Sequence, residues 1–286
     1  MGTWRLFHDL QVPISALLLA PVGQRFAAIG RILYRGYSVE QQRKDHHMTT
    51  NHTDPQRLYL MQVAMIPERK LPYVCYLVQT SDGINVLIDS GLPANVPPPP
   101  GMPMPLMGRN VIEQLEQIGL QPGDIDLLVC THFDPDHSGH HAAFTNAELI
   151  VQRQHYELAR SGFQRFSATR EQWDHPALRY RLVEGDMQLF PGLQLIETSG
   201  HVPGHQSVLV RLPQTGPVLL TIDAVPRQKD FTPEREAGPG DMDRELLRAS
   251  TRKLLDLVQR EQIALVVFGH DLEQWQTLKK APDFYS

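Results

Sequence analysis

Four side chains that can bind metal ions stand within six residues of one another in the loop Thr131–His141, THFDPDHSGHH. They are His132, Asp134, Asp136 and His137. Neutral imidazole and carboxylate groups are good ligands for Zn, Mn and Fe. Alternate residues of an extended segment point the same way, so we expect His132, Asp134 and Asp136 to face one side. The pattern favours a metal site over a polar surface loop that is rich in histidine.

Three further residues of ligand type stand further along the chain, each after an apolar run that is typical of a buried strand. They are His201, Asp223 and His270, and the runs are Leu193–Ile196, Val218–Ile222 and Ile263–Phe268. An isolated His after Gly is often a turn residue, and an Asp at a strand end is often a helix cap. Together with the loop Thr131–His141 they make four such positions in one chain, which favours a shared metal centre.

Apolar runs bounded by turn residues predict the strands that must carry these side chains. Besides the three runs above, they are Leu58–Ile66, Tyr73–Thr80, Asn85–Ile88, Ile125–Cys130, Leu149–Val151 and Ser207–Leu212. The turn Ser81-Asp82-Gly83 predicts a hairpin. The proline-rich stretch Pro93–Pro105 is expected either as a surface connection or as a wall of a substrate pocket.

Apolar residues at helical spacing predict the helices Asn110–Ile118, Gln154–Ser161, Pro176–Arg181 and Arg244–Glu261. In the last of these, one face is expected to carry Leu246, Leu247, Leu254, Leu255 and Val258. Strands and helices alternate along the chain. This order suits an α/β fold in which two sheets pack face to face and the helices lie outside.

The chain resembles the metallo-β-lactamase superfamily, whose metal loop usually reads His-x-His-x-Asp-His, and within it the N-acyl-homoserine lactonase branch. Similar segments follow one another in the family's order over about residues 58 to 280. They are Asn85–Pro93 (NVLIDSGLP), Thr131–Gly139, Leu149–Arg153 (LIVQR), Val183–Asp186 (VEGD), His201–Ser207 (HVPGHQS), Leu219–Ala224 (LLTIDA) and Phe268–Asp271 (FGHD).

The resemblance implies an αββα sandwich of two mixed β-sheets flanked by helices, with a site for two divalent metal ions along one edge. It implies that one ion is held by His132, Asp134 and His201, the second by Asp136, His137 and His270, and that Asp223 bridges them. Two ions roughly 3.5–4 Å apart can share a hydroxide and polarise a carbonyl. Asp136 is also expected to pass a proton to the leaving oxygen as a catalytic acid.

Two positions depart from the lactonase pattern. Asp134 stands where the family has histidine, and a carboxylate shifts the metal preference from the expected Zn towards Fe or Mn. Pro226 stands where lactonases of this branch have a tyrosine that helps to hold the substrate carbonyl. Replacements for that tyrosine are sought among Tyr73, Tyr76, Tyr156 and Arg227.

Other polar residues near the loop are expected to support the site rather than to bind metal. We expect His140, His141 and His205 to pack around the ions. Asp89 and Asp271 are expected to act as hydrogen-bond partners of ligands or as caps at strand ends.

These features predict a metal-dependent hydrolase that opens a lactone, such as an N-acyl-homoserine lactone, or cleaves a related ester. Such an enzyme would be a quorum-quenching lactonase that takes a small-molecule substrate. A glyoxalase II-type thioesterase is the alternative among hydrolases. A diiron oxygen or nitric-oxide redox protein is favoured by Asp134 but has no electron-donor module in this chain, and a non-catalytic metal-binding protein is a third alternative. No Gly-x-Ser-x-Gly elbow and no glycine-rich phosphate loop occur in the sequence.

Composition agrees with one large α/β domain. The chain has 286 residues and a net charge of −5, without a Lys/Arg run, which argues against a nucleic-acid partner. The two cysteines, Cys75 and Cys130, lie in apolar runs and are expected as buried free thiols. The sequence does not indicate an oligomeric state.

Residues 1–47 are expected as an accessory segment or leader that precedes a hydrolase domain of residues 48–286. The apolar stretch Leu10–Val22 is too short to span a bilayer, so no transmembrane span is predicted. The start of the chain supports a secretory signal only weakly, and a cytoplasmic location is the expectation.

Overall fold

The computed structural model describes residues 53–98 and 101–286. The expected boundary between an accessory segment ending at residue 47 and a domain starting at residue 48 lies outside these residues. Within them, no helix has the length and apolar character needed to cross a membrane.

The first sheet has seven strands in the order β4-β1-β2-β3-β5-β6-β7. Strands β1, β2, β3 and β4 pair antiparallel, whereas β3, β5, β6 and β7 run parallel. Their bounds are β1 Pro55–Ile66, β2 Leu71–Thr80, β3 Asn85–Ile88, β4 Leu106–Met107, β5 Leu127–Val129, β6 Glu148–Gln152 and β7 Arg179–Val183.

The second sheet has five strands in the order β12-β11-β10-β9-β8. Its pairs are antiparallel except for β11 and β12, which are parallel. Their bounds are β8 Met187–Phe190, β9 Leu193–Glu197, β10 Gln206–Leu212, β11 Gly216–Ile222 and β12 Leu265–Phe268. Both sheets are therefore mixed, as expected.

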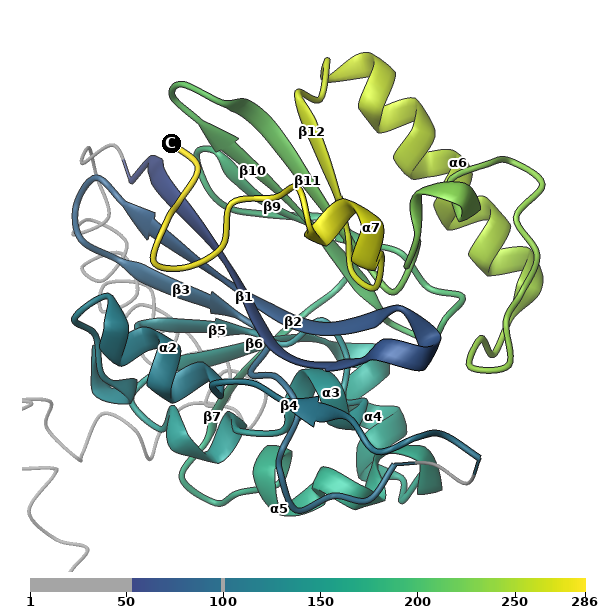
Figure 1. The fold of residues 1–286 in the computed structure, drawn as a ribbon, viewed down its shortest axis with the longest axis horizontal. Coiled ribbons are helices and arrows are strands. Elements are labelled where there is room, and N and C mark those ends of the chain that lie inside the picture. Colours follow the sequence, from purple (N-terminus) through teal and green to yellow (C-terminus); the bar gives the residue numbers. More distant parts are fainter. Residues whose placement is uncertain (1–52, 99–100) are drawn as a thin grey trace, which may run out of the picture. The chain divides into compact units, whose positions relative to one another are not determined.

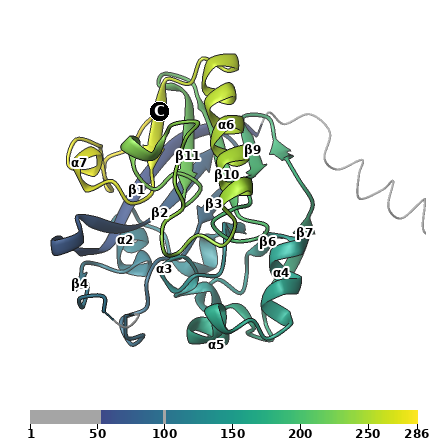
Figure 2. The same ribbon diagram turned by 90° about the vertical axis from the view of Figure 1, so that its right-hand side faces the viewer.

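The two sheets face each other across an apolar layer, and helices cover their outer sides (Figures 1 and 2). The α-helices are α2 Val111–Gln117, α3 Pro135–Ser138, α4 Arg153–Arg160, α5 Arg170–Trp173, α6 Arg244–Arg260 and α7 Leu272–Trp275. Side chains of α2, α4 and α5 pack on the outside of the first sheet, and α6 packs on the outside of the second. The predicted αββα sandwich is confirmed.

Short 3-10 helices complete the connections, at Pro67–Arg69, Pro122–Asp124, His141–Ala143, Gln164–Thr169 and Gln228–Asp230. The expected helix Asn110–Ile118 is observed as α2, which Asn110 caps and in which Glu113 closes a capping box. Cys75 and Cys130 are buried and unpaired, which confirms the expected free thiols.

Two local predictions were wrong. In place of the expected helix Pro176–Arg181, a turn leads into strand β7, which begins at Arg179. The more exposed arginines of β7 alternate with the more covered Tyr180 and Leu182 along the parallel partner β6. On α6 the buried face is set by Leu247, Leu254 and Leu257, and Leu246 is 46% exposed. The face of α6 that packs on the sheet therefore does not include Leu246, which was expected to lie on it.

Candidate metal centre

The seven residues singled out in the sequence lie in the segments that follow strands β5, β9, β11 and β12. His132 follows β5, His201 follows β9, Asp223 follows β11 and His270 follows β12. The extended conformation expected from His132 to Asp136 ends at Asp134, because Pro135–Ser138 forms the helical turn α3. Proline fits the first turn of a helix, where its missing N–H is not needed. Asp136 and His137 thus project from a helical turn rather than from a strand.

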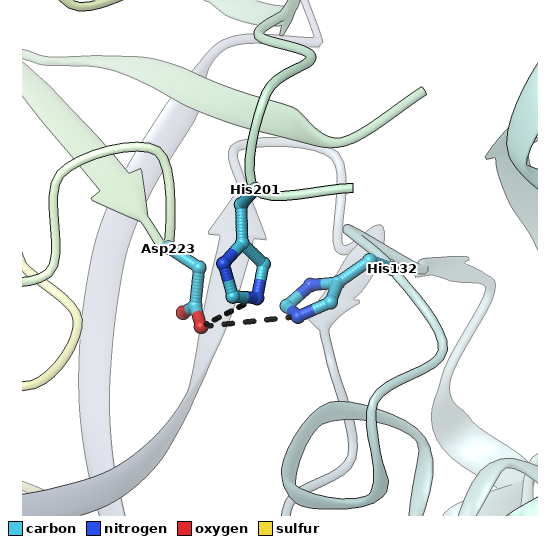
Figure 3. Close-up of side chains that lie close together, drawn as sticks. All are labelled: His132, His201 and Asp223. Atoms are coloured by element: carbon cyan, nitrogen blue, oxygen red, sulfur yellow. Dashed lines mark ion pairs between the residues drawn. The ribbon is translucent and has the colours of Figure 1, made fainter. Parts of the chain in front are cut away.

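A first group consists of His132, His201 and Asp223, whose ligand atoms lie within 4.8 Å of one another. Figure 3 shows the three side chains converging from three separate loops. The Asp223 Oδ2 atom lies 3.4 Å from His201 Nε2 and 3.9 Å from His132 Nε2. The group is almost wholly buried.

A second group consists of Asp136, His137 and His270, again with ligand atoms within 4.8 Å. The other oxygen of Asp223, Oδ1, lies 3.3 Å from His137 Nε2 and 3.0 Å from His270 Nε2. Asp223 therefore directs one oxygen to each group and connects the two.

Each of the four histidines is held through its Nδ1 atom, so that Nε2 points to the centre of its group. The partners of Nδ1 are Thr131 Oγ1 for His132 at 3.1 Å, Asp89 Oδ2 for His137 at 2.8 Å, Asp241 Oδ1 for His201 at 2.8 Å and the Pro72 carbonyl for His270 at 2.7 Å. Such outer hydrogen bonds fix the ring orientation and the tautomer of metal-binding histidines.

Three buried polar atoms at the centre lack a hydrogen-bond partner among the described residues. They are His132 Nε2, His137 Nε2 and Asp223 Oδ1. Buried polar atoms are nearly always paired, so each of these needs a partner of another kind. All three belong to the two groups, and a cation between the side chains would satisfy them.

The charges around the centre favour bound cations. Burial alone would raise the pKa of Asp223, but His270 and His137 hold it well below its ordinary value. Burial would lower the pKa of His137, but Asp136, Asp223 and Asp89 raise it well above the usual range. The carboxylates thus draw protons onto the histidines, and metal ions bound in the same place would displace those protons.

Asp134 lies beside the first group but is also bound by a residue that the sequence did not single out. Its Oδ2 atom is 3.2 Å from His201 Nε2 and 3.4 Å from His132 Nε2. Arg165 donates from Nε to Oδ1 at 2.6 Å and from Nη2 to Oδ2 at 2.5 Å. One feature of the sequence indicates such a partner. Asp134 stands where the family has histidine, and its carboxylate adds a negative charge that an arginine can balance.

The remaining histidines near the loop form hydrogen bonds with neighbouring backbone or hydroxyl groups and are not part of the two groups. His205 Nε2 accepts a hydrogen bond from the Asp223 backbone N–H at 3.2 Å, which helps to orient that residue. His155 Nε2 accepts from the Phe133 N–H at 2.8 Å, and burial lowers the pKa of His155 to about 3. His140 and His141 both bond to Ser90, and Asp271 caps α7.

A cavity of about 950 Å³ opens over both groups. One wall is apolar and comes mainly from β2 and from the proline-rich stretch after Pro93. It contains Leu71, Tyr73, Leu92, Val96, Pro97, Pro98, Met102 and Pro105. Another part of the lining, the charged wall, carries Arg165, Arg227, Lys229 and Arg235. Of the two expectations for the proline-rich stretch, the pocket wall is the one observed.

Tyr73 and Arg227 line this cavity, whereas Tyr76 and Tyr156 do not. The Tyr73 ring lies edge-on to His270, with ring centroids 6.0 Å apart. Burial, followed by the charges of Asp136 and Asp223, raises the pKa of Tyr73 far above its ordinary value. Its hydroxyl therefore stays protonated and can donate a hydrogen bond into the cavity.

Position 200, just before His201, requires glycine because of its backbone conformation and because of the atoms packed against it. Its φ is +140°, and an added Cβ would lie 2.3 Å from the backbone nitrogen of Leu247. We expect Gly200→Ala to lower the free energy of unfolding by at least about 3 kcal/mol, since backbone strain and overpacking add. Urea unfolding of the variant and the wild type measures this change in the free energy of unfolding.

Gly119→Ala is the matched control for Gly200→Ala, because Gly119 also has a positive φ but no atom near the added Cβ. We expect Gly119→Ala to cost about 1 kcal/mol. Equal losses in the two variants would show that the contact with Leu247 is not a tight one.

Comparison with known proteins gives a consistent set of similarities. The profile of the metallo-beta-lactamase superfamily matches residues 69–270. An N-acyl homoserine lactonase from Bacillus sp is 36% identical over 225 residues, covering 75% of this chain and 87% of that protein. N-acyl homoserine lactonase AiiA from Bacillus thuringiensis subsp. kurstaki is 34% identical over 229 residues, with the same 75% and 87% coverage.

The structure is also similar to that of an N-acyl homoserine lactone hydrolase that has the product N-hexanoyl-L-homoserine bound at its catalytic metal centre. The TM-score is 0.70 at 30% sequence identity, and the match covers 81% of this chain and 100% of that chain.

Proposed function

The chain belongs to the metallo-beta-lactamase superfamily and, within it, to the N-acyl homoserine lactonase family, and from this premise we propose that it is a dinuclear metal-dependent lactonase. The substrate class is a lactone, with N-acyl homoserine lactones first, or a related carboxylic ester. One observation carries the proposal: Asp223 directs Oδ1 to one pair of histidines and Oδ2 to another pair.

The distances between side chains support a fit to two zinc ions. In a tetrahedral site with zinc bonds of about 2.0–2.1 Å, neighbouring ligand atoms lie about 3.3–3.4 Å apart. Around the first group the nitrogen–oxygen distances from His132 and His201 to Asp134 and Asp223 run from 3.2 to 3.9 Å. Around the second, those between His137, His270, Asp136 and Asp223 run from 3.0 to 3.7 Å.

We therefore propose His132, Asp134 and His201 for one ion, Asp136, His137 and His270 for the other, and Asp223 as the bridge. When bound, such ions supply a water of lowered pKa and polarise a carbonyl. The unpartnered atoms His132 Nε2, His137 Nε2 and Asp223 Oδ1 support this assignment.

The protein's own side chains then have separate tasks. Asp136, which lines the cavity, can hold a proton and pass it to the leaving oxygen of the opened ring. Tyr73 can donate its hydroxyl to the substrate carbonyl and so take the part of the tyrosine that Pro226 replaces. The apolar wall formed by Leu71, Leu92 and Met102 suits an acyl chain and keeps water away from it.

Zinc is the proposed metal, and Asp134 is proposed to widen the range of metals accepted. We expect Asp134→His to move the preference towards Zn and away from Mn and Fe, because imidazole is a softer ligand than carboxylate. Competition among equal concentrations of the three metals, read by elemental analysis, measures the change. Lactone hydrolysis should persist in the Zn-loaded variant.

Arg165→Gln is the control for Asp134→His, since it releases the Asp134 carboxylate from its guanidinium partner without removing it. We expect Arg165→Gln to strengthen the relative binding of Mn and Fe. An unchanged metal preference in both variants would show that Asp134 is not a ligand.

The function is tested by metal analysis combined with a panel of lactones, esters and thioesters. We expect two ions per chain and hydrolysis of N-acyl homoserine lactones that stops when a chelator removes the metal. Preference for a thioester would favour the glyoxalase II-type alternative. A fully metallated protein that leaves the whole panel intact but reduces oxygen with an electron donor would favour the diiron alternative.

A further inference from the structure

Arg235 is a buried guanidinium on the charged wall of the cavity, and the metal centre does not account for it. Its side chain is 3% exposed, yet it lines the same cavity as His201, Asp223 and His270. Its Nε and Nη1 atoms have no hydrogen-bond partner among the described residues. Its nearest acidic partner, Asp241, has Oδ2 3.6 Å from Nη2, beyond ordinary hydrogen-bond distance.

This arrangement is costly in the absence of a ligand. A buried charge without full hydrogen bonding destabilises a protein unless something else binds to it. Burial lowers the pKa of Arg235 even though Asp241 and Asp230 act in the opposite direction. An arginine remains charged in proteins, so Nε and Nη1 are two buried donors that still need an acceptor.

The other cationic side chains of the cavity are occupied or exposed. Arg165 uses Nε and Nη2 on Asp134 and Nη1 on the Gly240 carbonyl. Arg227 donates from Nη2 to the Arg69 carbonyl, and Lys229 is exposed. Among the residues that the structure describes along this wall, Arg235 is thus the buried cation with donors to spare.

We propose that Arg235 forms a carboxylate-binding subsite, and that the substrates of this enzyme are lactones or esters whose acyl part carries a carboxylate. The inference rests on the proposed function and narrows its substrate class. A carboxylate supplies acceptor oxygens for Nε and Nη1, which the ion pair with Asp241 through Nη2 leaves without a partner. A plain alkyl chain would leave Nε and Nη1 buried and unpaired.

The subsite lies one side chain away from the metal centre. Asp241 accepts from His201 Nδ1 at 2.8 Å and faces Arg235 on its other side. A ligand that occupies both places therefore carries two oxygen groups joined by a carbon chain. Adipate and hexanoate form a matched probe pair, because both have six carbons and one carboxylate for the metals, and adipate alone has a second.

The test is calorimetric binding of both probes to the zinc-loaded full chain. We expect adipate to bind about tenfold to a hundredfold more tightly than hexanoate. This is the gain in affinity that a charge-assisted hydrogen bond provides. Arg235→Met should bring the two affinities close together, and Arg235→Lys should leave part of the difference. Lys229→Met removes an exposed charge from the same cavity and should keep the full difference.

Equal affinities of the wild type for both probes would overturn the subsite, and so would a preference for adipate that survives in Arg235→Met. Zinc content and thermal melting of each variant establish that the protein is folded, and Arg235→Lys gives the answer if Arg235→Met fails to fold. Lactone hydrolysis without any preference for adipate refutes the subsite alone. A preference that depends on Arg235 in a protein that hydrolyses no lactone refutes the lactonase proposal alone.

Discussion

Asp223→Ala is expected to leave a protein that retains at most one metal ion per chain and loses lactone hydrolysis by on the order of 10³-fold or more. The physical reason is that one carboxylate serves both groups. Its Oδ1 faces His137 and His270, and its Oδ2 faces His201, so no other side chain can replace both contacts. Elemental analysis and the rate of ring opening are measured on the same sample.

A second effect of Asp223→Ala is expected in thermal stability. Ligands that bind only the folded state stabilise it, so a protein that binds fewer ions melts at a lower temperature in the presence of zinc. Without zinc the difference should shrink, because Asp223 then no longer holds an ion. Asp256→Ala, which removes an exposed carboxylate on α6, is the control and should keep both metals and full activity. Two ions retained by Asp223→Ala would refute the bridge.

The inner strands of the two sheets could be predicted from the sequence because the runs that form them are apolar on both faces, whereas the short strands β4 and β8 were not predicted. Val86, Leu87 and Ile88 of β3 are all fully buried, and so are Val218, Leu219 and Leu220 of β11. Such runs are typical of strands covered on both sides. The wrongly predicted helix at Arg179 failed for the opposite reason: its pattern is half polar, and its conformation is decided by pairing with β6.

The proposed ligand residues could also be singled out from the sequence, because each is a histidine or aspartate at the end of an apolar run or in the loop that follows it. The hydrogen-bond partners of Nδ1 were harder to find. Asp89 was expected in this role, but Asp241 and the Pro72 carbonyl come from segments with no distinguishing pattern. Contacts of this kind depend on how two distant loops meet, and local composition does not determine that.

The charged wall of the cavity could not be predicted from the sequence for the same reason. Arg165 and Arg235 are two among many arginines, and nothing near either of them indicates burial. Their roles follow from the fold, which brings Arg165 to Asp134 and leaves Arg235 beside Asp241. The proposed substrate class therefore rests on a residue, Arg235, that only the tertiary structure identifies.

Asp136→Asn is expected to reduce kcat for lactone opening by on the order of 10²-fold or more, the size of a lost general acid–base group. Asp136 Oδ2 lies 3.4 Å from His137 Nε2 and 3.7 Å from His270 Nε2. The same carboxylate lines the cavity, so it can meet both an ion and the leaving oxygen. Asparagine keeps the shape and an oxygen ligand but cannot accept and return a proton.

Leaving-group dependence separates the two roles of Asp136. An ester whose leaving group is acidic, such as a nitrophenol, needs no proton, so Asp136→Asn should cleave it nearly as fast as the wild type does. An equal loss on lactone and nitrophenyl ester would mean that Asp136 acts through metal binding alone, and metal content measured on the same preparation would then fall in proportion. Asp230→Asn, which alters another carboxylate of the cavity, should leave both rates unchanged. The pair of substrates therefore identifies the proton-transfer role even if the variant binds its ions less tightly.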